Sequence, residues 1–413
     1  MKGANYEIKK KLFNISVQNV TLLCCILFLM VTFGGCAASD ASDKQLITYS
    51  RGYQSGFFYD ENLYLKGLTR YNLVTGESSV ICGVPGCLHN GPECLLNQYV
   101  INDSFSAIYD THALFFDNKS SCLYMINTDG TGIKKLIDFS EYDDVFVWDK
   151  LLIDNNFYLA VQLNNQSLDE TGYVNTVSGA AKLYRINMLT GSVDILHESK
   201  SSLKSTILKL LFTDNSIIFT YYLRTKKIED SGLSQREYYE KFDEYYKRMD
   251  EIEGIEYYCI VYNLENDTYY NINTCSDNIQ YEASCAINGN IYFGGDDGNI
   301  YIKSLDAEDS PFDLFTVPGV NHNSKVSITQ SSDFALFKVY NKGAGYDYYM
   351  IKEGSDTLTC LSEDIDSDFE LLDECYCQLK VQFFDASEAE GFSEFDEDKI
   401  KLISRDEFKS WFK

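Results

Sequence analysis

The sequence contains few of the residues that usually separate independent domains. Only four of its 413 residues are proline, and no long tract of serine, glycine or charged residues interrupts it. Flexible or proline-rich segments of that kind are where domain boundaries usually fall. We therefore expect one continuous architecture and no linker between separate domains.

Histidine, tryptophan and positive charge are also scarce. There are four histidines and two tryptophans, and the formal net charge is −27. The chain carries no G-x-S-x-G elbow, no H-E-x-x-H motif and no Walker loop, and His112, His197 and His322 stand alone in the sequence, which argues against the enzyme classes that these motifs mark. Because so acidic a surface repels phosphate, we expect no nucleic-acid partner.

Residues 1–35 are predicted to be an export signal. A lysine-rich start precedes the apolar run VTLLCCILFLMVTF, residues 20–33, which has the length of a signal-peptide core and falls short of the about 20 residues that span a membrane. The following FGGC, residues 33–36, resembles the lipobox of bacterial lipoproteins, although Phe33 stands where the family usually has leucine. The resemblance implies that Cys36 is lipidated and anchors the mature chain to the extracytoplasmic face of the cell membrane. An ordinary cleaved signal or an uncleaved anchor is the alternative.

The rest of the chain carries a degenerate repeat. Its 32 tyrosines and 26 phenylalanines favour strands. Four segments share an apolar start, an asparagine, a turn rich in Gly, Asp and Thr, and a returning strand: YNLVTGESSVI (71–81), INTDGTGIKKLI (126–137), INMLTGSVDIL (186–196) and YNLENDTYYNI (262–272). An apolar strand precedes each copy, and weaker copies follow, so we take Asn72, Asn127, Asn187, Asn263, Ser304 and Lys352 as anchors.

The spacing of these anchors predicts a β-propeller. Steps of 41 to 76 residues, each holding several short strands, are typical of propeller blades. LYMINTDGTGIKKL (123–136) resembles the repeats of TolB-like and YWTD-like β-propellers, which implies that fold and no particular activity. We expect an all-β propeller over residues 45–413, behind a short tether at 36–44, with seven blades or alternatively six. The segment 45–50 is expected to close the ring on the last blade. A β-sandwich is the alternative fold.

Two segments have helical patterns. Residues 233–253 carry a capping pattern at Ser234 and Glu237 and an apolar stripe at three- and four-residue spacing that ends before Gly254. We expect a helical insertion of about five turns there. Ser404 and Glu407 repeat the capping pattern and predict a short C-terminal helix.

The Cys-rich loop, residues 82–94, is the main candidate for chemistry. It places Cys82, Cys87, His89 and Cys94 within thirteen positions, together with two Pro-Gly or Gly-Pro turns. Three thiolates and an imidazole are a set that zinc prefers in structural sites, so we predict a structural zinc site. In an exported protein, a disulfide between two of the three cysteines is the alternative. The loop resembles Cys-rich loops of uncharacterised propeller lipoproteins of Gram-positive bacteria, from which no activity carries over.

Together these features favour a lipid-anchored cell-envelope β-propeller that acts as a binding or scaffold protein. Its ligand, whether a protein, a peptide or a small molecule, is not specified by the sequence, and no catalytic residue is indicated. Two alternatives remain at this point. One is an envelope enzyme with an active site in the central funnel, and the other is a metal-handling or sensor protein that uses the Cys-rich loop.

Overall fold

The structure is a computed structural model, and it divides the chain into residues 1–45 and a compact unit, Leu46–Lys413. Within the second unit it describes residues 46–49, 57–58, 63–66, 68–72, 77–168, 174–200, 202–213, 215–245, 248–276, 279–295, 299–305, 311–320, 324–331, 333–341, 345–362, 368–374, 378–384 and 400–413. The predicted signal peptide, the tether and Cys36 lie outside these residues. No helix among the described residues is long and apolar enough to cross a membrane.

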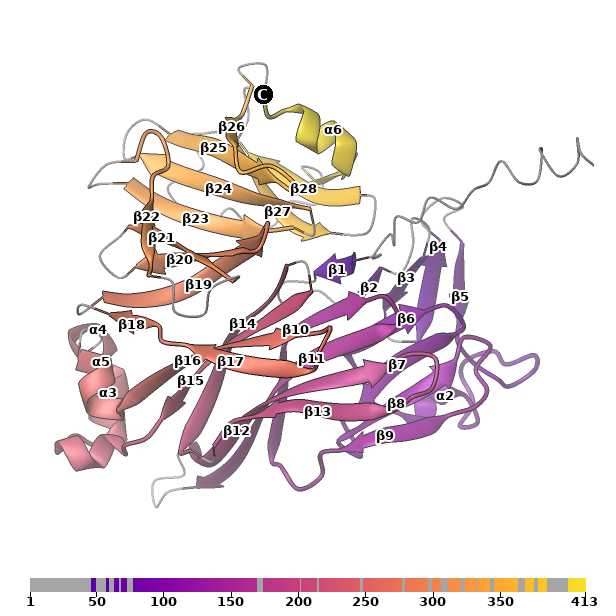
Figure 1. Cartoon of the computed structure of the whole chain (residues 1–413). Helices are drawn as coiled ribbons and strands as arrows, with labels where there is room; N and C mark the ends of the chain where they lie inside the picture. Colours follow the sequence, from indigo (N-terminus) through magenta and orange to yellow (C-terminus); the bar gives the residue numbers. More distant parts are fainter. Residues whose placement is uncertain are drawn as a thin grey trace, which may run out of the picture. The chain divides into compact units, whose positions relative to one another are not determined.

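The described strands form seven antiparallel sheets that follow one another along the chain (Figure 1). We number the sheets 1 to 7 in chain order. Sheet 1 holds β2 (Phe57–Phe58), β3 (Leu63–Lys66), β4 (Thr69–Asn72) and β5 (Ser78–Val80). Sheet 2 holds β6 (Ile101–Tyr109), β7 (His112–Asp117), β8 (Cys122–Asn127) and β9 (Lys134–Asp138). Sheet 3 holds β10 (Asp144–Ile153), β11 (Asn156–Leu168), β12 (Val174–Asn187) and β13 (Val193–Glu198).

The remaining four sheets are also built from strands that are consecutive in the chain. Sheet 4 holds β14 (Lys204–Thr213), β15 (Ser216–Arg224), β16 (Ile255–Asn263) and β17 (Thr268–Ile272). Sheet 5 holds β18 (Cys275–Ser276), β19 (Ile279–Ile287), β20 (Asn290–Gly295), β21 (Ile300–Ser304) and β22 (Asp313–Phe315). Sheet 6 holds β23 (Ser324–Gln330), β24 (Phe334–Asn341), β25 (Gly345–Lys352) and β26 (Leu358–Cys360). Sheet 7 holds β27 (Asp368–Glu374), β28 (Gln378–Phe384) and β29 (Ile400–Ser404).

The anchors of the sequence repeat occupy one structural position. All six end a strand, and each is paired with the first residue of the strand before it, as His112 with Asn127, Asn156 with Asn187 and Ser216 with Asn263. Asparagine suits this position because its side chain caps the turn that follows: Asn187 Oδ1 accepts hydrogen bonds from the N–H groups of Leu189 and Thr190. The repeat therefore marks the end of the strand that enters each outer hairpin.

Neighbouring sheets share their apolar cores. Among the described residues, each of six cores takes residues from two consecutive sheets, and none of these six spans three. One residue from each of the two sheets illustrates each core, from sheets 1 and 2 to sheets 6 and 7. These are Ile81 with Phe115, Phe116 with Leu159, Leu183 with Phe219, Val261 with Phe293, Tyr292 with Phe337, and Met350 with Val381. Repeated sheets packed face to face in chain order are the organisation of a propeller. The predicted all-β propeller is confirmed, and the number of blades stays a prediction.

Polar side chains link the turns of neighbouring sheets. Lys134 of sheet 2 donates from Nζ to the carbonyl oxygen of Gly191 in the last turn of sheet 3, at 3.0 Å. Arg185 of sheet 3 pairs with Asp267 in the corresponding turn of sheet 4, with Nη1 and Oδ1 2.9 Å apart. These contacts tie successive outer hairpins to each other beside the apolar cores.

The first strand differs from our expectation. β1 (Leu46–Tyr49) pairs with β10, through Leu46 with Ile153 and Ile47 with Leu152, and so joins sheet 3 (Figure 1). We expected this segment to pair with the last blade, which is wrong. β10 is the first of the four consecutive strands of its sheet, so the edge that faces away from β11 offers unpaired backbone groups to an added strand.

The insertion between β15 and β16 is helical but is not one helix. It contains the 3₁₀ turn Ile228–Ser231, then α3 (Gln235–Glu240), α4 (Phe242–Tyr245) and α5 (Met249–Glu253) (Figure 1). Tyr238, Ile252 and Ile228 are buried in one small core. In a straight helix Tyr238 and Ile252 would lie about 21 Å apart, so the segment has to fold back on itself to bury them together. The predicted cap is present, because Ser234 Oγ accepts the N–H of Glu237.

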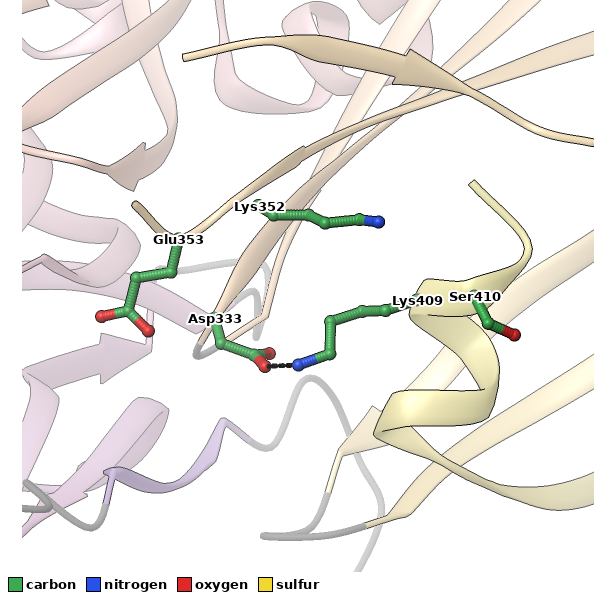
Figure 2. Close-up of a pocket in the computed structure, with 5 residues that line it drawn as sticks. All are labelled: Asp333, Lys352, Glu353, Lys409 and Ser410. Carbon is green, nitrogen blue, oxygen red and sulfur yellow. Dashed lines mark hydrogen bonds and ion pairs between the residues drawn. The ribbon is translucent and has the colours of Figure 1, made fainter. Parts of the chain in front are cut away.

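The C-terminal helix α6 (Arg405–Ser410) packs on sheets 6 and 7. Ser404 caps it as predicted, accepting the N–H of Glu407, and Phe408 is fully buried. Asp333, in the turn before β24, binds two cations of the helix: Arg405 Nη1 at 2.7 Å and Lys409 Nζ at 2.6 Å. Figure 2 shows the Lys409 ammonium directed at the Asp333 carboxylate. The helix is thus held by one apolar contact face and one ion-pair cluster.

Candidate metal centre

The Cys-rich loop connects sheet 1 to sheet 2. It begins after β5, where Ile81 is fully buried and donates its N–H to the carbonyl oxygen of Leu68 at 2.6 Å. It ends at the short helix α2 (Leu95–Gln98), whose N-cap residue is Cys94. Both ends of the loop are therefore fixed by the shared core of the two sheets, which also contains Leu95.

The loop brings all four predicted ligands together. One ligand atom from each of Cys82, Cys87, His89 and Cys94 lies within 4.8 Å of the other three. In a tetrahedral zinc site with bonds of about 2.3 Å, neighbouring ligand atoms are about 3.8 Å apart. Small side-chain adjustments therefore suffice for this set to hold a zinc-type ion. Among the described residues no other group of three or more His, Cys, Asp or Glu side chains comes together in this way.

His89 reaches the cluster through an unusual backbone conformation. Its φ angle is +59°, in the left-handed region that a residue with a side chain seldom adopts. Its N–H donates to Cys87 Sγ at 3.3 Å, and its Nδ1 lies 3.4 Å from Cys94 Sγ. Strained residues of this kind concentrate at functional and ligand-holding positions, because the surrounding structure must hold them there.

Asn97 in α2 supports the strained part of the loop. Its Nδ2 donates to the carbonyl oxygen of Gly91 at 2.9 Å and to that of His89 at 3.4 Å. One side chain therefore holds the backbone on either side of the turn between His89 and Cys94. Such outer contacts orient the ligands of metal sites and are part of the binding energy.

The loop also rests on the β8–β9 turn of sheet 2. Gly83 and Gly130 face each other without side chains: a Cβ added to Gly83 would lie 2.5 Å from the Gly130 carbonyl oxygen, and one added to Gly130 would overlap the backbone of Cys82 and Gly83. Gly130 also has a φ angle of +83°. This glycine pair fixes the position of Cys82 against the second sheet.

The three thiols influence each other's ionisation. Burial raises the pKa of Cys82, but hydrogen bonds from the backbone and from the other two thiols outweigh it, so the pKa lies below the usual value. The hydrogen bond from the His89 N–H lowers the pKa of Cys87, and burial together with the neighbouring thiols outweighs that, so the pKa is raised. Cys82 therefore ionises at a lower pH than Cys87. A bound cation would stabilise the negative charge of the Cys87 thiolate.

No disulfide joins the seven cysteines whose side chains the structure describes. Cys82, Cys87 and Cys94 are free thiols, as are Cys122, Cys259, Cys285 and Cys360. Cys122, Cys259 and Cys285 are buried in strands, as expected for small apolar residues. Burial raises the pKa of the Cys259 thiol to about 12, so this thiol is chemically inert at neutral pH.

A pocket lies beside the C-terminal helix. It is a shallow pocket of about 420 Å³ lined by Asp333, Lys352, Glu353, Lys409 and Ser410 (Figure 2). Its lysines already bind the protein: Lys409 binds Asp333, and Lys352 Nζ donates to the carbonyl oxygen of Phe412 at 3.2 Å. These cations hold the end of the chain, so we do not assign a ligand to this pocket.

Comparisons with known proteins give only distant likenesses. No family model matches the chain, and no curated protein matches it. Among solved structures, an oligogalacturonate lyase from Vibrio parahaemolyticus has a TM-score of 0.40 at 8% identity, covering 87% of this chain and 84% of that one. The WD40 domain of SCAP from fission yeast has a TM-score of 0.37 at 8% identity, covering 88% and 87%. An uncharacterized protein from Listeria monocytogenes has a TM-score of 0.36 at 11% identity, covering 74% and 82%. We base no conclusion about activity on these likenesses.

Sequence reasoning named the four residues that come together in the cluster but missed the residues that position them. The hydrogen bonds of Asn97 were not expected, although its place three residues after Cys94 makes it a neighbour in the helix that follows the loop. The contact between Gly83 and Gly130 joins positions 47 residues apart, and nothing near either glycine in the sequence indicates it. His112 and His197 lie outside the cluster, as the sequence suggested.

Proposed function

We propose that this chain is a lipid-anchored binding or scaffold protein of the extracytoplasmic membrane face, whose Cys-rich loop holds a structural zinc ion. The observation that carries the metal assignment is the convergence of Cys82, Cys87, His89 and Cys94 within 4.8 Å. The anchor is supported by the lipobox-like FGGC that ends at Cys36. The strongly acidic composition favours partners other than nucleic acids.

The metal would join two sheets. Cys82 and Cys94 stand at the two ends of the loop, beside Ile81 and Leu95, which belong to the core shared by sheets 1 and 2. A zinc ion bound by both residues closes the loop on the core and stabilises the connection in the way that structural zinc sites stabilise small folds. Three thiolates and one imidazole fill a tetrahedral zinc site, so this arrangement supports a structural role more than catalysis.

The propeller fold supports the proposed binding role. Propellers support many functions through the loops and ends of their blades. Within the described residues, the only cluster of metal-binding side chains is the one in the Cys-rich loop. The molecule that the propeller binds is not specified. The proposed zinc ion has a structural role in the loop and is not part of the binding site for that molecule.

Metal analysis tests the zinc assignment. The full-length protein, purified in detergent without oxygen, is expected to contain one equivalent of zinc by mass spectrometry. Cys87→Ser is expected to lose it, whereas Cys122→Ser, a buried cysteine outside the loop, is expected to keep it. Equal metal content in all three proteins, or none in the wild type, contradicts the assignment.

Labelling tests the anchor. Cells that express the wild type and Cys36→Ala are grown with a labelled palmitate analogue. We expect label on the wild type alone, and release of the variant from the membrane fraction. The same label on both proteins would show that Cys36 is not the lipidated residue.

A further inference from the structure

The three thiols of the candidate metal centre lie close to one another. Their sulfur atoms are within 4.8 Å of each other and of a ring nitrogen of His89. A zinc ion needs all three as thiolates, whereas a disulfide needs only two of them. Since the same sulfur atoms serve both, the loop can hold a zinc ion or a disulfide but not both at once.

Accessibility separates the three thiols. Cys82 and Cys87 are half-buried, whereas Cys94 is fully buried. Cys94 is also the residue whose sulfur lies beside His89 Nδ1, and it occupies the N-cap position of α2. An oxidant from solvent therefore reaches Cys82 or Cys87 first, and the other of these two is the more accessible partner for a disulfide.

We propose that the candidate metal centre is a redox switch, in which a peroxide converts Cys82 and Cys87 into a disulfide and expels the metal. This inference rests on the proposed function, because it requires that the loop bind zinc when reduced. It identifies a regulated state of the loop: a zinc-bound reduced form and a metal-free oxidised form. Cys94 and His89 remain in the oxidised form as two ligands, too few to hold zinc.

The chemistry balances with hydrogen peroxide as the oxidant. One thiolate attacks a peroxide oxygen, which forms a sulfenic acid and releases hydroxide, taken up as water. The second thiol then attacks the sulfenic sulfur; an S–S bond forms, the S–O bond breaks and a second water leaves. Two thiols and one peroxide thus give one disulfide and two waters. The zinc ion leaves unchanged in oxidation state.

The local backbone is suited to this exchange. The turn from Val84 to Cys87 is closed by a hydrogen bond between the Cys87 N–H and the Val84 carbonyl oxygen, and Gly86 stands in the left-handed region with nothing within 4 Å of an added Cβ. Space around Gly86 lets the turn move Cys87 towards Cys82. The Gly83–Gly130 contact and α2 hold the other two cysteines in place.

The experiment uses the full-length protein in detergent with Cys360→Ser, which removes an exposed thiol outside the loop. Hydrogen peroxide is added to the zinc-bound protein, free zinc is followed with a chromogenic chelator, and free thiols are counted. We expect release of one equivalent of zinc with loss of two thiols, and recovery of both after reduction and zinc addition. The tryptic peptide between Arg70 and Lys119 is expected to carry an alkyl label on Cys94 alone. It should be two mass units lighter than the same singly labelled peptide with Cys82 and Cys87 reduced.

Two variants separate the steps. Cys94→Ser is expected to lose zinc and still form the disulfide, whereas Cys82→Ser is expected neither to hold zinc nor to form the disulfide. Wild-type protein that holds zinc and keeps all three thiols in peroxide overturns the switch and leaves the zinc assignment standing. Wild-type protein without zinc overturns the proposed metal centre and the switch together. A disulfide that includes Cys94 overturns the assigned pair.

Discussion

Gly83 and Gly130 lie back to back, and neither position has room for a side chain. The first belongs to the Cys-rich loop and the second to the β8–β9 turn of sheet 2. This contact, between residues far apart in the sequence, decides where Cys82 lies relative to the core. It leads to the first prediction.

Gly130→Ala is expected to destabilise the protein and to weaken zinc binding. A Cβ at this position carries the strain of a positive φ angle, about 1 to 2 kcal/mol, and collides with the backbone of Cys82, which adds about 1 to 3 kcal/mol. The control is Gly354→Ala, where φ is +73° and nothing lies within 4 Å, so that only strain is measured. Denaturant unfolding of both variants gives the difference, and equal losses would mean that the glycine contact is unimportant.

Asn97→Asp is expected to weaken zinc binding about tenfold and to lower stability by about 1 to 2 kcal/mol. The change removes the donor that holds the carbonyl groups of His89 and Gly91 and places a negative charge against them. Gln98→Ala is the control, because the Gln98 side chain donates from Nε2 to the Glu93 carbonyl oxygen, and the bond from its backbone N–H to the Cys94 carbonyl oxygen is kept in the variant. Competition with a zinc chelator measures both affinities, and a similar loss in the two variants would argue against a positioning role for Asn97.

Because of Asp333, the free energy of unfolding is expected to depend on pH in the acid range. Burial raises the pKa of this carboxyl, but Arg405 and Lys409 outweigh it, so the pKa in the folded state lies below its usual value. A lowered pKa means that the contribution is complete above the unfolded pKa, about 3.9, and is lost as the pH falls below it. Asp333→Asn should cost about 3 kcal/mol at neutral pH and progressively less as the pH falls from the unfolded pKa through the folded one. Unfolding curves across this range test it, and a loss that is independent of pH would contradict the ion-pair explanation.

The helical insertion is expected to be removable. It has its own small core, and the hairpin beneath it continues to Arg224, which pairs with Ile255. Replacing residues 226–253 with Asn-Gly supplies a two-residue hairpin turn. Because Glu253 forms a buried ion pair with Arg224, at 2.7 Å, Arg224→Met should accompany the deletion. We expect a melting temperature within about 5 °C of the wild type by circular dichroism, and a clearly lower one if Arg224 is kept. Loss of folding in both forms would show that the helices support sheet 4.

The strands were largely predictable because their causes are local. Alternation of apolar residues and an asparagine that caps its own turn specify each hairpin from within about twelve residues, and all six anchors end strands as a consequence. The segment around Tyr238 and Ile252 was not predictable in the same way. Its apolar spacing is the same whether the helix is straight or folded back, and only the burial of both residues beside Ile228 decides between them.

The candidate site was likewise predictable in its local features and not in its non-local ones. The ligand types and their spacing stand in one short stretch, so residue chemistry alone indicated a metal or a disulfide. What brings Cys82 into place is a glycine in the next sheet, and what steadies His89 is a side chain in the following helix. The pairing of β1 with β10 is likewise non-local, since many strand edges accept an added strand and sequence does not rank them.

The shared cores set limits on how this protein can be shortened. A fragment that ends between two consecutive sheets would leave half of a core, such as the face that carries Leu183 or the one that carries Phe219, open to water. Large exposed apolar faces of that kind lead to aggregation. Fragments for crystallisation or binding assays should therefore keep all the sheets, and trimming is best confined to surface segments such as the helical insertion.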